Sequence, residues 1–65
     1  MWTVVYMAQS REIAVKLQEL LSDEGILVKL RPTSKNQDNN DNYFEVLVPA
    51  AEIEEAHSVI IEKGY

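Results

Sequence analysis

The asparagine- and aspartate-rich segment of this 65-residue sequence is the first place to look for a metal site. Asp38, Asn40 and Asn42 match the first three ligand positions of a calcium-binding loop. Tyr43 then stands where the sharp turn needs glycine, and Pro49 stands where the loop needs its bidentate glutamate. The match is incomplete, so a solvated loop is the favoured interpretation and no metal is expected.

Catalytic side chains are equally sparse. Glu54 and His57 have the Glu-x-x-His spacing of di-iron bundles, but that site requires a second such motif and two further glutamates. There is no cysteine, the four serines have no motif around them, and His57 is the only imidazole. We therefore expect a structural role for His57 near the buried side of a helix, and we expect neither a catalytic residue nor a cofactor.

Lys29, Arg31 and Lys35 form the only local basic cluster. They could contact an anion such as a phosphate or carboxylate at the start of the loop. The simpler interpretation is that they protect an edge strand from pairing with other chains, with Lys29 opposite Glu45 on the neighbouring strand. No glycine-rich phosphate loop supports the anion site, because Gly25 and Gly64 are both expected to end helices.

Composition limits the class of protein. With 46% hydrophobic and 26% charged residues the chain should fold, but a domain this short has marginal stability. It has no disulfide and no metal cage to compensate, so a homo-oligomer, with a dimer favoured, is the expected stabiliser. The net charge of −5 argues against nucleic acid and anionic membranes as partners. No signal peptide or membrane-spanning run is recognisable, so a cytoplasmic location is expected.

The elements that must position these residues follow from periodicity and caps. Ser10 predicts a helix start, and Gly25 predicts its end, with Ile26 packing back on Leu21. The residues expected on the buried side of the second helix are Ile53, Ala56, His57, Ile60 and Ile61. The single predicted domain, residues 1–65, comprises strand 2–7, helix 11–24, strand 26–31, loop 32–42, strand 43–48 and helix 50–63.

This β-α-β-β-α order predicts an α+β, ferredoxin-like split βαβ fold. We expect a three-stranded antiparallel sheet in the order first–third–second, with both helices on one face. The last strand of the usual fold is missing or vestigial. The first strand, the most apolar of the three, then lies at an open edge.

The sheet face opposite the helices is the predicted interaction surface. If Phe44, Val46 and Val48 face the helices, alternation turns Tyr43, Glu45 and Leu47 outward. On the first strand we expect Thr3, Val5 and Met7 inward and Trp2, Val4 and Tyr6 outward, although the reverse pleat would also expose an apolar set. Exposed apolar patches usually mark contact sites. The predicted interface residues are Trp2, Val4, Tyr6, Tyr43 and Leu47.

Several short patterns together resemble a known family. They are Tyr6-x-Ala8-x-Ser10, the helix Ala14…Leu17…Leu20-Leu21, the corner Glu24-Gly25-Ile26, and Val46-x-Val48-Pro49 followed by a helix carrying Ala56. The chain resembles, over nearly its whole length, the small bacterial family of prokaryotic signal-transducing proteins, compact ferredoxin-like domains similar to the nitrogen-regulatory PII proteins. The resemblance implies a fold and a regulatory role but no activity.

The PII comparison implies that the loop between the second and third strands contacts partners. In PII proteins nucleotides bind in clefts between subunits, but here the loop is short and the last strand that helps to build those clefts is absent. Some short chains similar to this one carry the label glutamate decarboxylase, which is not physically credible here. Such enzymes enclose pyridoxal phosphate in a deep pocket between large domains, and 65 residues cannot do so.

The leading functional hypothesis is therefore a small, non-enzymatic, cytoplasmic module that self-associates and acts through protein–protein contacts, with a regulatory or signal-transducing role. The alternative is a sensor of a small ligand, a nucleotide, amino acid or carboxylate, that uses the basic cluster and the loop. An enzyme is the weakest hypothesis, because no matched acid–base pair occurs in a plausible pocket.

Overall fold

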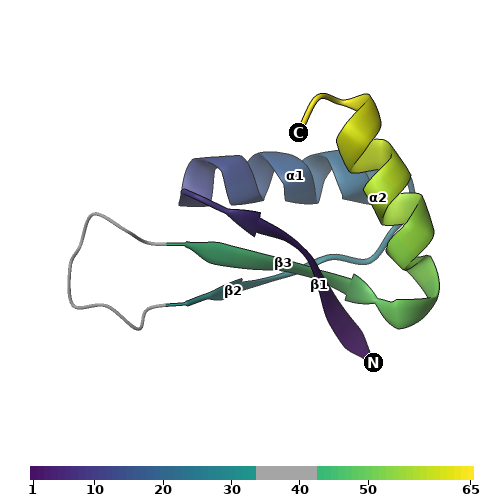
Figure 1. Cartoon of the computed structure of the whole chain (residues 1–65), viewed down its shortest axis with the longest axis horizontal. Coiled ribbons are helices and arrows are strands. Elements are labelled where there is room, and N and C mark those ends of the chain that lie inside the picture. Colours follow the sequence, from purple (N-terminus) through teal and green to yellow (C-terminus); the bar gives the residue numbers. More distant parts are fainter. Residues whose placement is uncertain (34–42) are drawn as a thin grey trace.

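The computed structural model of the chain describes residues 1–33 and 43–65, and shows the predicted α+β fold (Figure 1). Its elements, in chain order, are β1 (Trp2–Ala8), α1 (Arg11–Asp23), β2 (Lys29–Pro32), β3 (Phe44–Pro49), the 3₁₀ helix η1 (Ala50–Glu52) and α2 (Ile53–Glu62). The predicted β-α-β-β-α order is confirmed. The calcium-loop match at Asp38, Asn40 and Asn42, and Lys35 of the basic cluster, lie outside the described residues.

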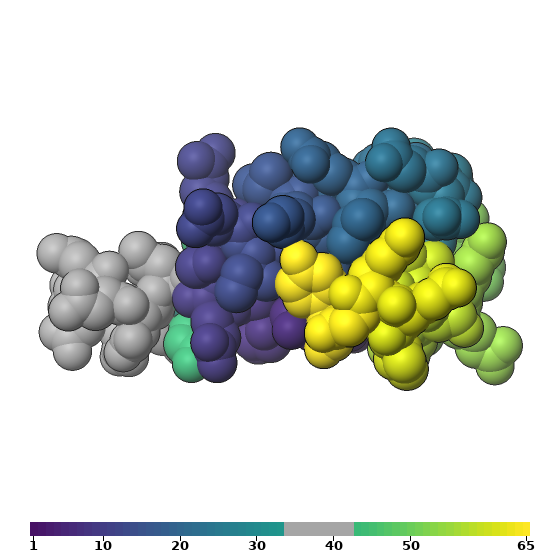
Figure 2. Space-filling view, turned by 90° about the horizontal axis from the view of Figure 1, so that it is seen from above, coloured from purple at the N-terminus to yellow at the C-terminus, as the bar shows by residue number. Residues whose placement is uncertain are grey.

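The sheet has the predicted strand order β1-β3-β2, and β3 is antiparallel to both neighbours. Strands β1 and β2 therefore run in the same direction on either side of β3, with α1 connecting them, which is the split βαβ arrangement. Both helices lie on one side of the sheet (Figure 1), and the view from that side shows them next to each other (Figure 2). The opposite face of the sheet has no helix over it within the described residues.

Helix α1 begins and ends as its sequence predicts. The Ser10 hydroxyl accepts a hydrogen bond from the Ile13 N–H at 3.2 Å, which satisfies one of the unpaired donors of the first turn. At the other end Gly25 has φ +84°, the left-handed conformation that glycine adopts without steric cost. The Ile26 N–H donates to the Leu21 carbonyl at 3.1 Å, which completes the predicted Schellman ending and turns Ile26 into the core.

Strand β2 is shorter than predicted, because it starts at Lys29 instead of residue 26. Lys29 lies opposite Leu47, so Leu27 would have to lie opposite Pro49. Proline has no N–H to donate to a neighbouring strand. The ladder therefore cannot continue toward Ile26, although Ile26 is buried and Val28 packs against the core.

The core lies between the sheet and the helices. The residues that β3 contributes to it are those predicted to face the helices. Val46 and Val48 are fully buried, and Phe44 packs against them from the end of the strand. The fully or nearly buried members of this core are Ala8, Ala14, Leu17, Leu21, Ile26, Val46, Val48, Ala56, Val59 and Ile60. Burial of this apolar area is the main stabilising term of the fold.

The prediction for the second helix was wrong in two respects. The segment starts as η1, and the buried side of α2 carries Val59 in place of His57 and Ile61. His57 is exposed, and Ile61 is 75% exposed. Ile53, Ala56 and Ile60 fit both stripes at helical spacing, so periodicity alone could not choose between them. Contacts with α1 as well as the sheet decide the choice in the folded chain.

Candidate functional site

A bulge in β1 sets which of its side chains face away from the helices. The register with β3 pairs Val4 with Leu47 and then Tyr6 with Val46, so Val5 is an extra residue in the ladder. Val5 and Tyr6 consequently both pack against the core, and Met7 turns to the open face of the sheet, where it is 48% exposed. Alternation is thus interrupted once within the strand.

Because of this bulge, the predicted faces of two residues, Tyr6 and Met7, are wrong. Trp2 and Val4 are exposed, and Thr3 and Val5 are half-buried, in agreement with the prediction. Tyr6 was predicted outward but is half-buried on the helix side, because it follows the bulge. Met7 takes its place outside. We call the three exposed side chains Trp2, Val4 and Met7 the β1 strip.

Leu47 lies on the open face, as predicted, but it is only 3% exposed. It pairs with Val4 on one side and with Lys29 on the other. The Lys29 Nζ lies 5.5 Å from the centroid of the Trp2 ring, so these two side chains meet across β3, beside Leu47. Leu47 is therefore covered within its own chain, while the β1 strip and Tyr43 remain exposed.

Backbone hydrogen bonds show which groups of β1 point to the edge of the sheet. The Ala50 N–H donates to the Met1 carbonyl at 2.8 Å, so Met1 and Ala50 form a hydrogen-bonded pair. Bonded and non-bonded pairs alternate in antiparallel ladders, so Thr3 also bonds toward β3 and the N–H and C=O groups of Trp2 and Val4 point away from it. Among residues 1–33 and 43–65 no strand pairs with the outer edge of β1, so within this part of the chain its outward backbone groups lie unpaired next to the β1 strip.

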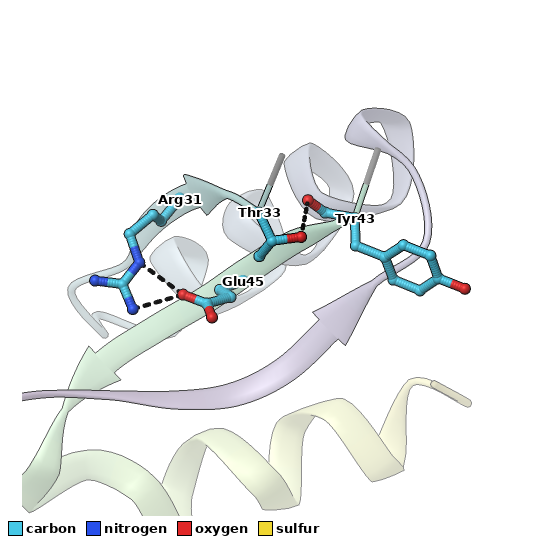
Figure 3. A network of polar contacts seen from close by, with 4 residues as sticks. All are labelled: Arg31, Thr33, Tyr43 and Glu45. Atoms are coloured by element: carbon cyan, nitrogen blue, oxygen red, sulfur yellow. Dashed lines mark hydrogen bonds and ion pairs between the residues drawn. The ribbon is translucent and has the colours of Figure 1, made fainter. Parts of the chain in front are cut away.

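The edge of β2 differs in chemistry from the edge of β1. The Thr33 N–H donates to the Tyr43 carbonyl at 3.0 Å. The Thr33 hydroxyl donates to the same carbonyl at 3.1 Å (Figure 3). By the same alternation Arg31 bonds toward β3, whereas Leu30 and Pro32 point their backbones outward. Pro32 has no N–H, so this edge is a poor template for another strand.

The described members of the basic cluster are engaged with neighbours. Arg31 lies opposite Glu45, and its Nε and one terminal nitrogen are both 2.6 Å from the same carboxylate oxygen (Figure 3). The predicted partner of Glu45 was Lys29, which instead lies opposite Leu47 and over Trp2. The error is one of register: the ladder starts at Lys29 and aligns Arg31 with Glu45. The structure does not bring Lys29 and Arg31 together around a free anion position.

Side chains of the chemical types considered for catalysis lie on the solvent-exposed surface of α2. His57 and Glu54 are both exposed on α2. Within residues 1–33 and 43–65, no three histidine, aspartate or glutamate side chains gather as metal ligands. Glu52 has one buried carboxylate oxygen without a hydrogen-bond partner in this part of the chain, but no second group accompanies it. In the same residues no helix has the length and apolar character of a membrane span.

The chain matches no protein-family model, and no similarity to a curated protein or to a solved structure reached significance. The functional argument therefore depends on the geometry of the chain itself. That geometry identifies the β1 strip, the edge of β1 and Tyr43 as the candidate interaction surface. Sequence reasoning missed Met7, and the only signal available was the run of consecutive apolar residues Val4-Val5-Tyr6-Met7, which leaves room for a bulge.

Proposed function

We propose that this protein is a small non-enzymatic module that self-associates through β1 and acts through protein–protein contacts. The observation that carries the proposal is the contrast between the two edges of the sheet. Strand β2 has Lys29, Arg31 and Pro32, the residue types with which proteins protect edge strands. Strand β1, Trp2–Ala8, has no Lys, Arg, Asp, Glu or Pro, and it places exposed apolar side chains beside backbone groups that no other strand of the described chain pairs with.

The lack of charge on β1 allows a second copy of this acidic chain to occupy the β1 edge. Each copy has a formal charge of −5, so two copies repel each other over most approaches. Strand β1 contributes none of that charge. A contact through β1 therefore brings no charged side chain of that strand against its copy, and it removes apolar surface from water.

A regulatory or signal-transducing role in the cytoplasm belongs to the same proposal. The β-α-β-β-α order and the caps at Ser10 and Gly25 fit the motifs through which the chain resembles the prokaryotic signal-transducing family. A module of this type transmits a signal by changing its partner or its assembly state. It requires no catalytic residue.

The small-ligand sensor is the weaker proposal. Its basic cluster would have to release Arg31 from Glu45 and Lys29 from Trp2 before either could bind an anion. Each exposed contact contributes about 1 kcal/mol or less, so release is feasible, but nothing in the described residues is arranged to receive a ligand afterwards. A self-associating module needs no such rearrangement.

A set of three variants tests the proposal. Val4→Glu places a carboxylate in the β1 strip of a chain that is already acidic, and it should shift the protein to monomer in size-exclusion chromatography with light scattering. Val4→Thr keeps a neutral β-branched residue and should associate as wild type does. Leu27→Glu adds the same charge at a residue that is 66% exposed and outside β1, and it should not change association. Equal behaviour of Val4→Glu and Leu27→Glu would contradict the proposal.

A further inference from the structure

We infer that β1 pairs antiparallel with β1 of a second copy, about a two-fold axis next to Thr3. The inference rests on the proposed function and specifies its geometry. The two copies would share one continuous sheet, with the β1 strands adjacent at its centre. Addition of a strand to a sheet edge is a recurring mode of recognition, in which main-chain hydrogen bonds supply affinity.

Only some residues of β1 point their backbone N–H and C=O groups away from β3, and this limits the registers available to such a pair. The Ala50–Met1 bond directs the backbone groups of Trp2 and Val4 outward, and those of Thr3 toward β3. Two β1 strands related by a two-fold axis can form hydrogen-bonded pairs only between residues whose backbone groups point away from their own β3. The register that places Trp2 of each copy opposite Val4 of the other meets this condition twice, once on each side of the axis. It also places the two Thr3 residues opposite each other.

The bulge disfavours the other registers. An axis at Val4 would place Trp2 opposite Tyr6 of the second copy, whose backbone bonds toward its own β3. A register that pairs Val4 of one copy with Met7 of the other would place Val5 and Tyr6 of both copies between the bonded pairs. These residues form the bulge, where the regular ladder is interrupted. An axis at Trp2 leaves a single bonded pair, Trp2 with Trp2, so only the register centred on Thr3 gives two bonded pairs that both precede the bulge.

Side chains and access agree with this register. Trp2 of one copy would lie opposite Val4 of the other on the open face, and the Trp2 ring leans over its own β3 toward Lys29, which leaves the edge of β1 uncovered by that ring. Within the described residues β1 is an outer strand of the sheet, so a second strand can approach its free edge. Strand β1 has no charged side chain, so the pairing places no like charges of β1 opposite each other across the axis.

Disulfide cross-linking tests the register, because the chain has no cysteine of its own. Opposite residues in a non-hydrogen-bonded antiparallel pair have Cα atoms about 4.5 Å apart, which lies within the range that disulfides span. Thr3→Cys should therefore cross-link roughly tenfold faster than Met7→Cys, since only the former holds its sulfurs at bonding distance. Met7 is more exposed than Thr3, so random collisions would give the opposite order.

Amide hydrogen exchange of the unmodified protein gives a second readout that needs no variant. With rising protein concentration the amides of Trp2 and Val4 should gain protection, and that of Met7 should not. If wild-type protein associates but Thr3→Cys cross-links no faster than Met7→Cys, or Met7 gains protection with Trp2, the register is wrong and the proposed function stands. If wild-type protein stays monomeric at every concentration, the proposed function falls and the pairing falls with it.

Discussion

The ring of Tyr65 stands edge-on to the ring of Tyr6, with 6.4 Å between centroids and 89° between planes. Gly64, at φ +88°, turns the chain after α2, and the Tyr65 N–H donates to the Ile60 carbonyl at 3.0 Å. This second Schellman ending places Tyr65 over β1. The same contact explains why Tyr6, on the helix side of the bulge, is only half exposed.

Loss of the Tyr65 ring should therefore destabilise the fold. Edge-on aromatic pairs contribute about 0.5–1.5 kcal/mol beyond the area that they bury, so Tyr65→Ala should lower the free energy of unfolding by about 1–2 kcal/mol. Tyr65→Phe keeps the ring and should cost little. Urea denaturation measures both variants; an alanine variant as stable as wild type would show that the pair contributes nothing.

The αL conformation of Gly25 leads to a second prediction. A Cβ at this position would meet no atom within 4 Å, so Gly25→Ala suffers only the backbone cost of the left-handed conformation. That cost is about 1 kcal/mol. Gly25→Asn should cost less, because asparagine tolerates this region better. Thermal unfolding that ranks Asn below Ala would contradict the assignment of Gly25 as the residue that ends α1.

The ion pair between Arg31 and Glu45 should contribute little to stability. Both nitrogens contact one carboxylate oxygen, but the Arg31 side chain is mostly exposed, and exposed pairs are worth about 0.2–1 kcal/mol. A double-mutant cycle with Arg31→Gln and Glu45→Gln should give a coupling energy in that range that decreases in high salt. A coupling well above it, or one insensitive to salt, would mean that the pair is shielded from solvent.

Trp2 is the only tryptophan, so its fluorescence reports on the contact with Lys29. Lys29→Ala removes the ammonium group that lies over the ring, together with the side chain that carries it. We expect stronger quenching of Trp2 by acrylamide in this variant at a dilution where the chain is monomeric. Lys16→Ala, at an exposed position on α1, is the control and should leave quenching unchanged.

Most of the fold could be predicted from local chemistry. Ser10 and Gly25 bound α1 because their roles depend on adjacent residues only, and the alternation of Phe44, Val46 and Val48 correctly predicted the buried face of β3. The order β1-β3-β2 followed from the handedness and length of the connections.

What could not be predicted depends on contacts between distant segments. The bulge at Val5 exchanges the faces of Tyr6 and Met7, and nothing in a run of apolar residues marks the position of an extra residue. The start of β2 depends on Pro49, which lies 20 residues beyond Lys29 in the sequence but beside its strand in space. The buried side of α2 depends on its packing against α1.

The central claim, that the β1 strip and its edge join two copies of this chain, is tested most directly by sedimentation of the wild-type protein over a wide concentration range. The account predicts a reversible shift, as concentration rises, from the mass of one chain to twice that mass. A single species with the mass of one chain at every concentration, including those well above micromolar, would contradict it.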